Sequence, residues 1–189
     1  MTLFRTVEPA AEPVTVADVK AQLRLDHSSE DALIADLIRA ARAEVEQATG
    51  CALIEQSWRL TLDDWPRGDC VLLQRFPVKR ILSVTIYGRD GGAAIVDPAT
   101  MLLDHRSRPA RLFFETKPQP GRAANGIEVD FVAGFGQAGT EVPDLLKRAV
   151  IMLASHWFEF RAVLSVKDQP ASYPKGYERL IAPYCTRRL

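Results

Sequence analysis

The sequence predicts an α+β fold, with N-terminal helices and a long C-terminal helix forming a helical core and an antiparallel β-sheet subdomain inserted between them. Three observations lead to this prediction. Apolar residues recur at helical spacing between residues 31 and 49. From residue 58 they alternate with polar residues, which is the period of a half-buried strand. From residue 141 the helical spacing returns.

Length and composition fit a soluble globular domain with room for an inserted subdomain. The chain has 189 residues, of which 47% are apolar and 25% charged, as in an average globular protein. No run of about 18 apolar residues is present to span a membrane. Residues 1–13 lack the basic start and apolar stretch of a signal peptide, which favours a cytosolic start.

The first part of the chain, residues 1–57, is expected to hold an arm and two helices. Two prolines oppose helix formation in residues 1–13, so these should be extended. Thr15 to Asp18 resembles a capping box, which predicts a short helix after it. A second, longer helix should follow Ser28 and reach about Thr49, since Gly50 suits the position after a helix end.

The second part, residues 58–136, is expected to form one antiparallel subdomain. Glycine-rich residues 88–92 read as a hairpin loop, and 117–126 as another loop. The connections are too short for parallel crossovers, so neighbouring strands should be antiparallel. Strands are expected at 58–62, 71–73, 81–87, 101–103, 111–115 and 127–131.

The rest of the chain is expected to hold a long helix and a tail. Residues 137–162 carry one apolar stripe, with Pro143 suited to the first turn, and should complete the helical core. Residues 163–189 are expected to be a docking tail. Three prolines interrupt this tail and leave room for one short helix around residues 177–181.

Charge is balanced overall but unevenly distributed. Residues 1–57 hold five Lys/Arg and ten Asp/Glu, whereas residues 137–189 hold eight Lys/Arg and five Asp/Glu. The acidic front argues against a dedicated nucleic-acid-binding protein, which normally has a concentrated basic face. The basic end fits either an acidic or phosphate-bearing partner or an ordinary solvated surface.

No catalytic, cofactor-binding or metal-ligating residues are expected. The three cysteines are far apart, and the three histidines are scattered, without the paired spacings of a zinc site. Asp63-Asp64 lies where a strand meets a turn, and Asp104-His105 reads as part of an exposed loop. The chain is therefore predicted not to be an enzyme and to need no cofactor.

One motif imitates a dinucleotide site. Gly134, Gly136 and Gly139 have the GxGxxG spacing between a strand and a helix. However, Pro143 displaces the helix start from the glycines, and no second strand follows to complete a βαβ unit. The glycines are therefore interpreted as a turn that takes the chain from the sheet into the helix.

Aromatic residues gather near the C-terminal end. His156 to Arg161 is the most aromatic stretch and is predicted to pack in the core at a helix end. The tail carries tyrosines in two turns and a terminal Arg pair, residue types that are enriched in interface hot spots. Docking to another surface and a frayed terminus both fit this composition.

Taken in order, these segments resemble the head–tail connector (adaptor) proteins of long-tailed phages. That family is also labelled as possible DNA-packaging proteins and has relatives in prophages and gene transfer agents. The resemblance departs at Cys185, where the family favours Arg; Arg187 and Arg188 would then supply the charge. It is carried by Val14–Asp26, Asp31–Ile54, Trp58–Pro66, Phe76-Pro77-Val78, Ser83–Tyr87, Ala133–Gly136, Val142-Pro143, His156–Arg161 and Leu180–Tyr184.

The resemblance implies a structural part of a virion or phage-like particle, assembled in the bacterial cytoplasm. Such proteins form a ring with themselves, usually twelve-fold, beneath the portal protein and receive a head-completion or stopper protein on the other side. Double-stranded DNA passes through the ring without sequence-specific binding, and no membrane is involved. The resemblance also implies a sheet inserted between the second and third main helices.

The tail is the candidate docking segment under this interpretation. We expect the portal-docking surface to include Tyr173, Tyr177, Tyr184, Arg187 and Arg188. Deleting residues 170–189 should then abolish portal binding and leave the fold intact. The alternative function is a DNA-binding packaging accessory factor, which salt-sensitive binding to linear DNA would indicate.

Overall fold

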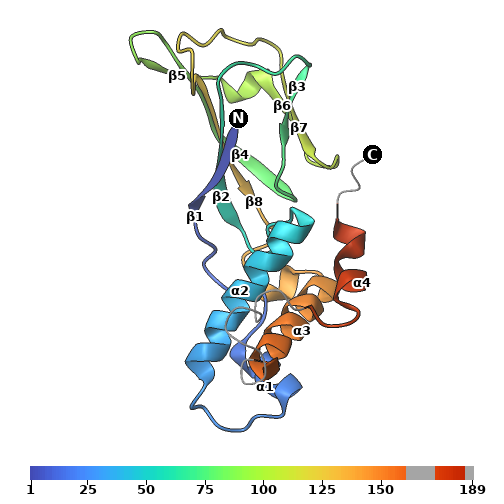
Figure 1. The fold of residues 1–189 in the computed structure, drawn as a ribbon. Helices are drawn as coiled ribbons and strands as arrows, with labels where there is room; N and C mark the ends of the chain where they lie inside the picture. Colours follow the sequence, from blue (N-terminus) through green and yellow to red (C-terminus); the bar gives the residue numbers. More distant parts are fainter. Residues whose placement is uncertain (161–172, 186–189) are drawn as a thin grey trace. The chain divides into compact units, whose positions relative to one another are not determined.

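A computed structural model describes residues 1–160 and 173–185. The chain divides into two compact units, each built from segments distant in the sequence. Unit 1 comprises Met1–Ala10 and Glu55–Gly134, and unit 2 comprises Ala11–Ile54 and Phe135–Leu189. The strands belong to unit 1 and the α-helices to unit 2 (Figure 1).

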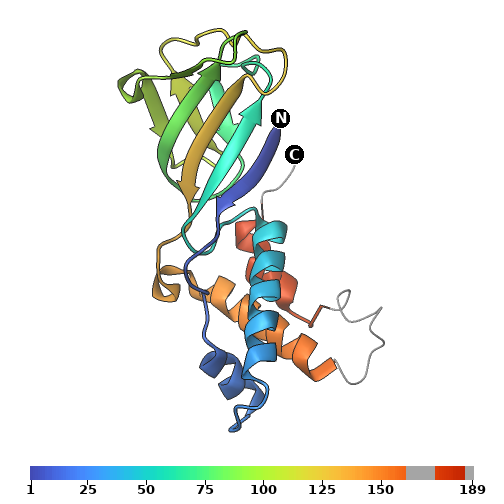
Figure 2. The ribbon, with the colours of Figure 1, turned by 90° about the vertical axis from the view of Figure 1, so that its left-hand side faces the viewer.

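Unit 1 contains two antiparallel sheets. The first has five strands in the order β1-β2-β8-β4-β5, and Figure 2 shows β1 (blue), β2 (teal), β8 (tan) and β4 (green) side by side. The second has three strands in the order β3-β7-β6. The strands are β1 (Thr2–Val7), β2 (Gln56–Leu62), β3 (Cys70–Leu73), β4 (Val78–Tyr87), β5 (Ala93–Ile95), β6 (Met101–Asp104), β7 (Ala110–Phe114) and β8 (Ile127–Ala133).

Strand alternation sets the core of unit 1. Leu60 on β2 and Val84 on β4 both pair with Val129 on the central strand β8, and all three side chains are buried. On the opposite face of that sheet, Arg59 makes a two-pronged ion pair with Asp130, at 2.7 and 2.9 Å. The hydrogen bonds to Asp130 raise the pKa of Arg59 and keep it charged. One face is therefore apolar and the other polar.

The described part of unit 2 is built around the helices α1 (Val16–Leu23), α2 (Asp31–Thr49), α3 (Asp144–Phe160) and α4 (Tyr177–Ile181). The expected capping box starts α1, because the Thr15 hydroxyl accepts from the Asp18 amide at 3.2 Å and Asp18 accepts from the Thr15 amide at 2.7 Å. Gly50 ends α2 in the left-handed conformation, as its position predicts. The apolar stripes of α2 and α3 pack against each other.

The described residues also contain short 3₁₀ turns. These are η1 (Pro98–Thr100), η2 (Gly139–Glu141) and η4 (Ala182–Tyr184). Across residues 1–160 and 173–185, no helix is long and apolar enough to cross a membrane.

The structure corrects the predicted fold class. A general α+β class fits, but the described residues do not form the expected long C-terminal helix or the helical core that it would complete. They form four short helices and two antiparallel sheets, not one inserted sheet. The C-terminal helix α3 begins only at Asp144, because a 3₁₀ turn precedes it and Pro143 lacks a backbone donor. Alternation shows which face a strand buries but not which strand is its partner, so it missed the division into two sheets.

Two strands also differ from prediction. The expected N-terminal arm is partly a strand, β1, which pairs with β2 at the edge of the larger sheet. The strand β5, which follows the expected hairpin loop, was not predicted. It has only three residues, all exposed, so it shows no alternation of buried and exposed side chains.

Candidate functional site

The candidate docking segment is anchored in unit 2 by α4. Gly176 precedes this helix in the left-handed conformation, with φ of 91°, which a glycine adopts without strain. Tyr177 is 2% exposed and Ile181 is 6% exposed, and α4 packs against α3. Burial raises the pKa of the Tyr177 hydroxyl. The predicted short helix at 177–181 is therefore confirmed, and it contributes to the core of unit 2.

Two of the predicted docking tyrosines lie together on this segment. Tyr173 is 50% exposed and stacks on Tyr177, with ring centroids 5.4 Å apart and planes at 19°. The Tyr173 hydroxyl donates to Glu44 of α2 at 2.7 Å, and this hydrogen bond raises the pKa of the tyrosine. Sequence reasoning missed Glu44, because 129 residues separate it from Tyr173 and no local pattern connects them.

The other predicted docking residues are placed differently. Tyr184 is half-buried and meets Phe135 edge to face, with centroids 6.5 Å apart. Arg187 and Arg188 lie outside the described residues. Cys185, where the family pattern is broken, donates its thiol to the Ala48 carbonyl at 3.7 Å. Cys185 thus holds the candidate docking segment against the end of α2.

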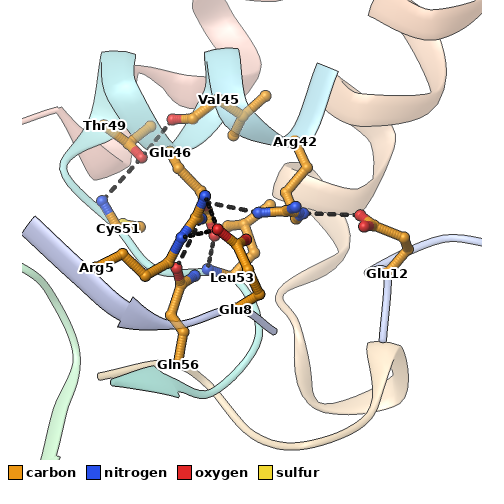
Figure 3. Close-up of polar contacts among 10 residues, drawn as sticks. All are labelled: Arg5, Glu8, Glu12, Arg42, Val45, Glu46, Thr49, Cys51, Leu53 and Gln56. Carbon is orange, nitrogen blue, oxygen red and sulfur yellow. Dashed lines mark hydrogen bonds and ion pairs between the residues drawn. The ribbon is translucent and has the colours of Figure 1, made fainter. Parts of the chain in front are cut away.

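A buried ion-pair network organises the other side of α2 (Figure 3). Arg42 donates to Glu12 at 2.7 Å and to Glu46 at 3.1 Å, and the Arg42 and Glu46 side chains are each only 6% exposed. Glu46 also accepts from the Leu53 amide at 2.8 Å. Burial alone would lower the pKa of Arg42, but the hydrogen bond and charge of Glu12 with the charge of Glu46 raise it. The network joins α2 to the segments before and after it.

The glycine turn is occupied by a side chain of the chain itself. The Glu141 carboxylate accepts from the Gln137 and Ala138 amides at 2.8 and 3.1 Å. A Cβ on Gly136 would lie 2.0 Å from the Glu141 carboxyl carbon, so only glycine leaves room for it. These backbone donors, which would face phosphate in a dinucleotide site, are already used. The interpretation of the glycines as a structural turn is supported.

Replacing Gly139 by alanine tests this turn. An added Cβ would lie 2.5 Å from the Pro13 carbonyl oxygen, which is backbone and cannot rotate away. We expect Gly139→Ala to lower the free energy of unfolding by about 1–3 kcal/mol, the usual cost of forcing extra volume into a packed site. Urea denaturation measures the loss. Gly68→Ala is the matched control, since nothing lies within 4 Å of its added Cβ; equal stability of the two variants would contradict the prediction.

Two carboxylates weighed for acid–base chemistry, Asp63 and Asp104, have structural partners. Asp104 caps its loop, accepting from the Ser107 hydroxyl at 2.6 Å and from Arg111 at 2.6 Å, and these contacts lower its pKa. Asp63 accepts from the Asn125 amide at 2.9 Å. Within the described ranges, no group of three or more His, Cys, Asp or Glu side chains is placed to hold a metal ion.

Comparisons with known proteins give the family. The model of the head completion protein family matches residues 12–166. The chain is similar to a chain of the virion of a native gene transfer agent particle, with 28% identity and a TM-score of 0.83 over 100% of this chain and 97% of that one. It is equally similar to a chain in the neck of an empty gene transfer agent particle computed with C6 symmetry, with the same identity, TM-score and coverage. A chain in the neck of the native particle, computed with C12 symmetry, has 28% identity and a TM-score of 0.80, again over 100% and 97% of the two chains.

No curated protein sequence matches the chain. The family model nevertheless spans the whole Glu55–Gly134 segment of unit 1 and, in unit 2, residues 12–54 and 135–166. The chain belongs to the head completion protein family.

Proposed function

We propose that this protein forms a ring beneath the portal of a tailed phage or phage-like particle and links the DNA-filled head to the stopper and tail. It is a structural head–tail adaptor of the head–tail interface. The observation that carries the proposal is similarity over the whole chain to a component of the gene transfer agent neck computed with C12 symmetry. That similarity supports a ring of copies of this chain, and we expect twelve copies when it is docked.

The charge balance of the chain fits a structural ring through which DNA passes. The formal net charge is zero, so the chain has no overall excess of positive charge with which to hold the phosphates. Strong phosphate contacts would hold DNA through counterion release and slow its passage. The comparisons give no support to the alternative role as a DNA-binding packaging accessory factor.

The portal-docking surface is proposed to combine Tyr173, Tyr184, Arg187 and Arg188, with Tyr177 as a positioning residue. Tyr177 is too buried to contact a partner directly, but its ring supports the exposed ring of Tyr173. Because Tyr177 and Ile181 are core residues, deleting 170–189 would damage the fold, contrary to the expectation from the sequence. Point substitutions at exposed or terminal positions are the sharper test.

Reversing the charges of Arg187 and Arg188 should weaken docking to the portal. We expect Arg187→Glu combined with Arg188→Glu to reduce binding to the cognate portal by at least about tenfold, because each reversal replaces attraction with repulsion at the contact. Co-sedimentation of the full-length variant with purified portal rings measures this. Arg67→Glu with Arg89→Glu is the control, since it makes the same change in charge at exposed positions of unit 1. Undiminished binding of the Arg187 and Arg188 variant would refute their assignment.

A further inference from the structure

Unit 1 carries a basic hollow that is not part of the candidate docking segment. It is open, has a volume of about 570 Å³, and lies between the start of β4 and the loop after β6. Its lining combines apolar and basic side chains: Phe76, Pro77, Val78, Lys79, His105 and Arg106. Arg108 lies at its margin, with its guanidinium 4.9 Å from the centre of the Phe76 ring.

Two cations of this hollow, Lys79 and Arg106, have no acidic partner within the described chain. Lys79, His105 and Arg106 are exposed, and no described carboxylate pairs with the side chain of Lys79 or Arg106. The nearest acidic residue in the loop, Asp104, is already engaged by Ser107 and Arg111. A concave surface with positive charge and an aromatic wall suits an anionic group of a partner.

The chain itself carries an acidic segment that would complement this hollow. Residues 26–36 contain four Asp or Glu and no Lys or Arg. One of these carboxylates, Asp31, is matched by Lys20, and Asp36 pairs with Arg39 at the exposed surface of α2. Asp26 is exposed and has no partner in the parts of the chain that the structure describes. The segment therefore presents negative charge on unit 2.

We propose that the basic hollow of one copy binds the acidic segment, residues 26–36, of the neighbouring copy in the ring. A ring needs a heterologous contact, in which two different surfaces of the same chain meet and the rotation closes. A basic surface on unit 1 and an acidic surface on unit 2 provide such a pair. This inference rests on the proposed function, because it names the contact between copies that the ring requires.

Contacts made of exposed ion pairs would favour ring assembly on a template. Each pair at a wet surface contributes little and is screened by salt. Copies gathered by the portal are held at high effective concentration, and the same weak contact is then made repeatedly around the ring. The contact therefore sets the register of neighbours without making the free protein assemble strongly.

Charge reversal with rescue tests the contact. We expect Lys79→Glu with Arg106→Glu to weaken ring assembly on the portal at least about tenfold, judged by electron microscopy and by half-saturation in sedimentation. Adding Asp26→Lys and Asp36→Lys to the same chain should restore part of the assembly, because residues 26–36 then offer two lysines to the new glutamates and are no longer net acidic. The control, Arg67→Glu with Arg89→Glu, changes charge equally outside the hollow and should assemble normally. The proposal is overturned if Lys79→Glu with Arg106→Glu leaves assembly unaffected. It is also overturned if that pair abolishes assembly and adding Asp26→Lys with Asp36→Lys restores none of it.

A direct readout separates this inference from the proposed function. A zero-length carbodiimide reagent joins the Lys79 amine to a carboxylate that contacts it, and mass spectrometry identifies the linked peptides. Mixing isotope-labelled and unlabelled copies reveals whether the link joins two copies. If the wild-type chain does not bind the portal, the proposed function fails, and cross-linking of the concentrated chain alone still tests the contact. Absence of a Lys79 link to residues 26–36 overturns the inference.

The last measurement is binding to linear double-stranded DNA. Phosphate groups would also fit a basic hollow, and their contacts would give binding that falls steeply with salt. We expect the wild-type chain and the Lys79 and Arg106 variant to bind DNA equally weakly. Salt-sensitive DNA binding that is lost in this variant, with ring assembly unchanged, would assign the hollow to nucleic acid and overturn the proposal.

Discussion

Glu46→Ala should destabilise unit 2 by about 3–5 kcal/mol, the usual cost of removing one partner from a buried ion pair. The substitution leaves the Arg42 guanidinium, whose side chain is 6% exposed, with only the partly exposed Glu12 as its counter-charge. It also removes the acceptor of the buried Leu53 amide. A buried charge that has lost one of its two partners and an unpaired backbone donor both oppose folding.

Chemical denaturation followed by the helical circular dichroism signal measures this loss. Asp36→Ala on the same helix is the matched control, because its ion pair with Arg39 is exposed on both sides and should contribute less than about 1 kcal/mol. Glu46→Gln keeps an acceptor for Leu53 and should lose less stability than Glu46→Ala. A loss below about 1 kcal/mol for Glu46→Ala would mean that the network is dispensable.

Substituting both Arg42 and Glu46 shows how much of the lost stability comes from the unpaired charge and how much from packing. Replacing both partners, with Arg42→Met and Glu46→Leu, removes the buried charges together and refills their volume with apolar atoms. Such exchanges are often neutral or stabilising for buried ion pairs. The double variant should therefore recover much of the stability lost in Glu46→Ala. It leaves the Leu53 amide without its acceptor, which limits the recovery.

The sequence predicts local features of this fold well, since their causes lie within a few residues. The capping box at Thr15 and Asp18 uses groups three residues apart, and both of its hydrogen bonds form. Gly50 marks the end of α2 because the left-handed conformation favours glycine. The short helix around Tyr177 follows from the prolines on both sides of it.

Long-range pairing is what the sequence does not predict. The pairing of β7 with both β3 and β6 makes the second sheet, and no pattern within these strands specifies their partners. The contact of Tyr173 with Glu44 and the filling of the glycine turn by Glu141 also depend on the folded chain. The candidate docking segment was proposed from its composition and from the family resemblance, whereas the burial of Tyr177 and Ile181 became visible only in three dimensions.

Phe131→Ala should cause a loss of similar size in unit 1, about 3–5 kcal/mol, because a large buried aromatic ring is replaced by a cavity. Phe131 is fully buried on β8, where its backbone pairs with Trp58 on one side and Ile81 on the other. The position joins three strands of the five-stranded sheet, so neighbouring side chains cannot collapse into the space without shifting the ladder.

Amide hydrogen exchange of the full chain locates this effect. Protection should fall in β2, β4 and β8, while α2 and α3 of the other compact unit keep more of theirs, because each unit has its own core. Phe131→Leu retains most of the apolar volume and should cost about 1–2 kcal/mol. Ile95→Ala is the surface control, since Ile95 is 71% exposed and little apolar contact is lost. An equal loss of protection in both units would show that they unfold together, so that a change in the sheet reaches the docking segment as well.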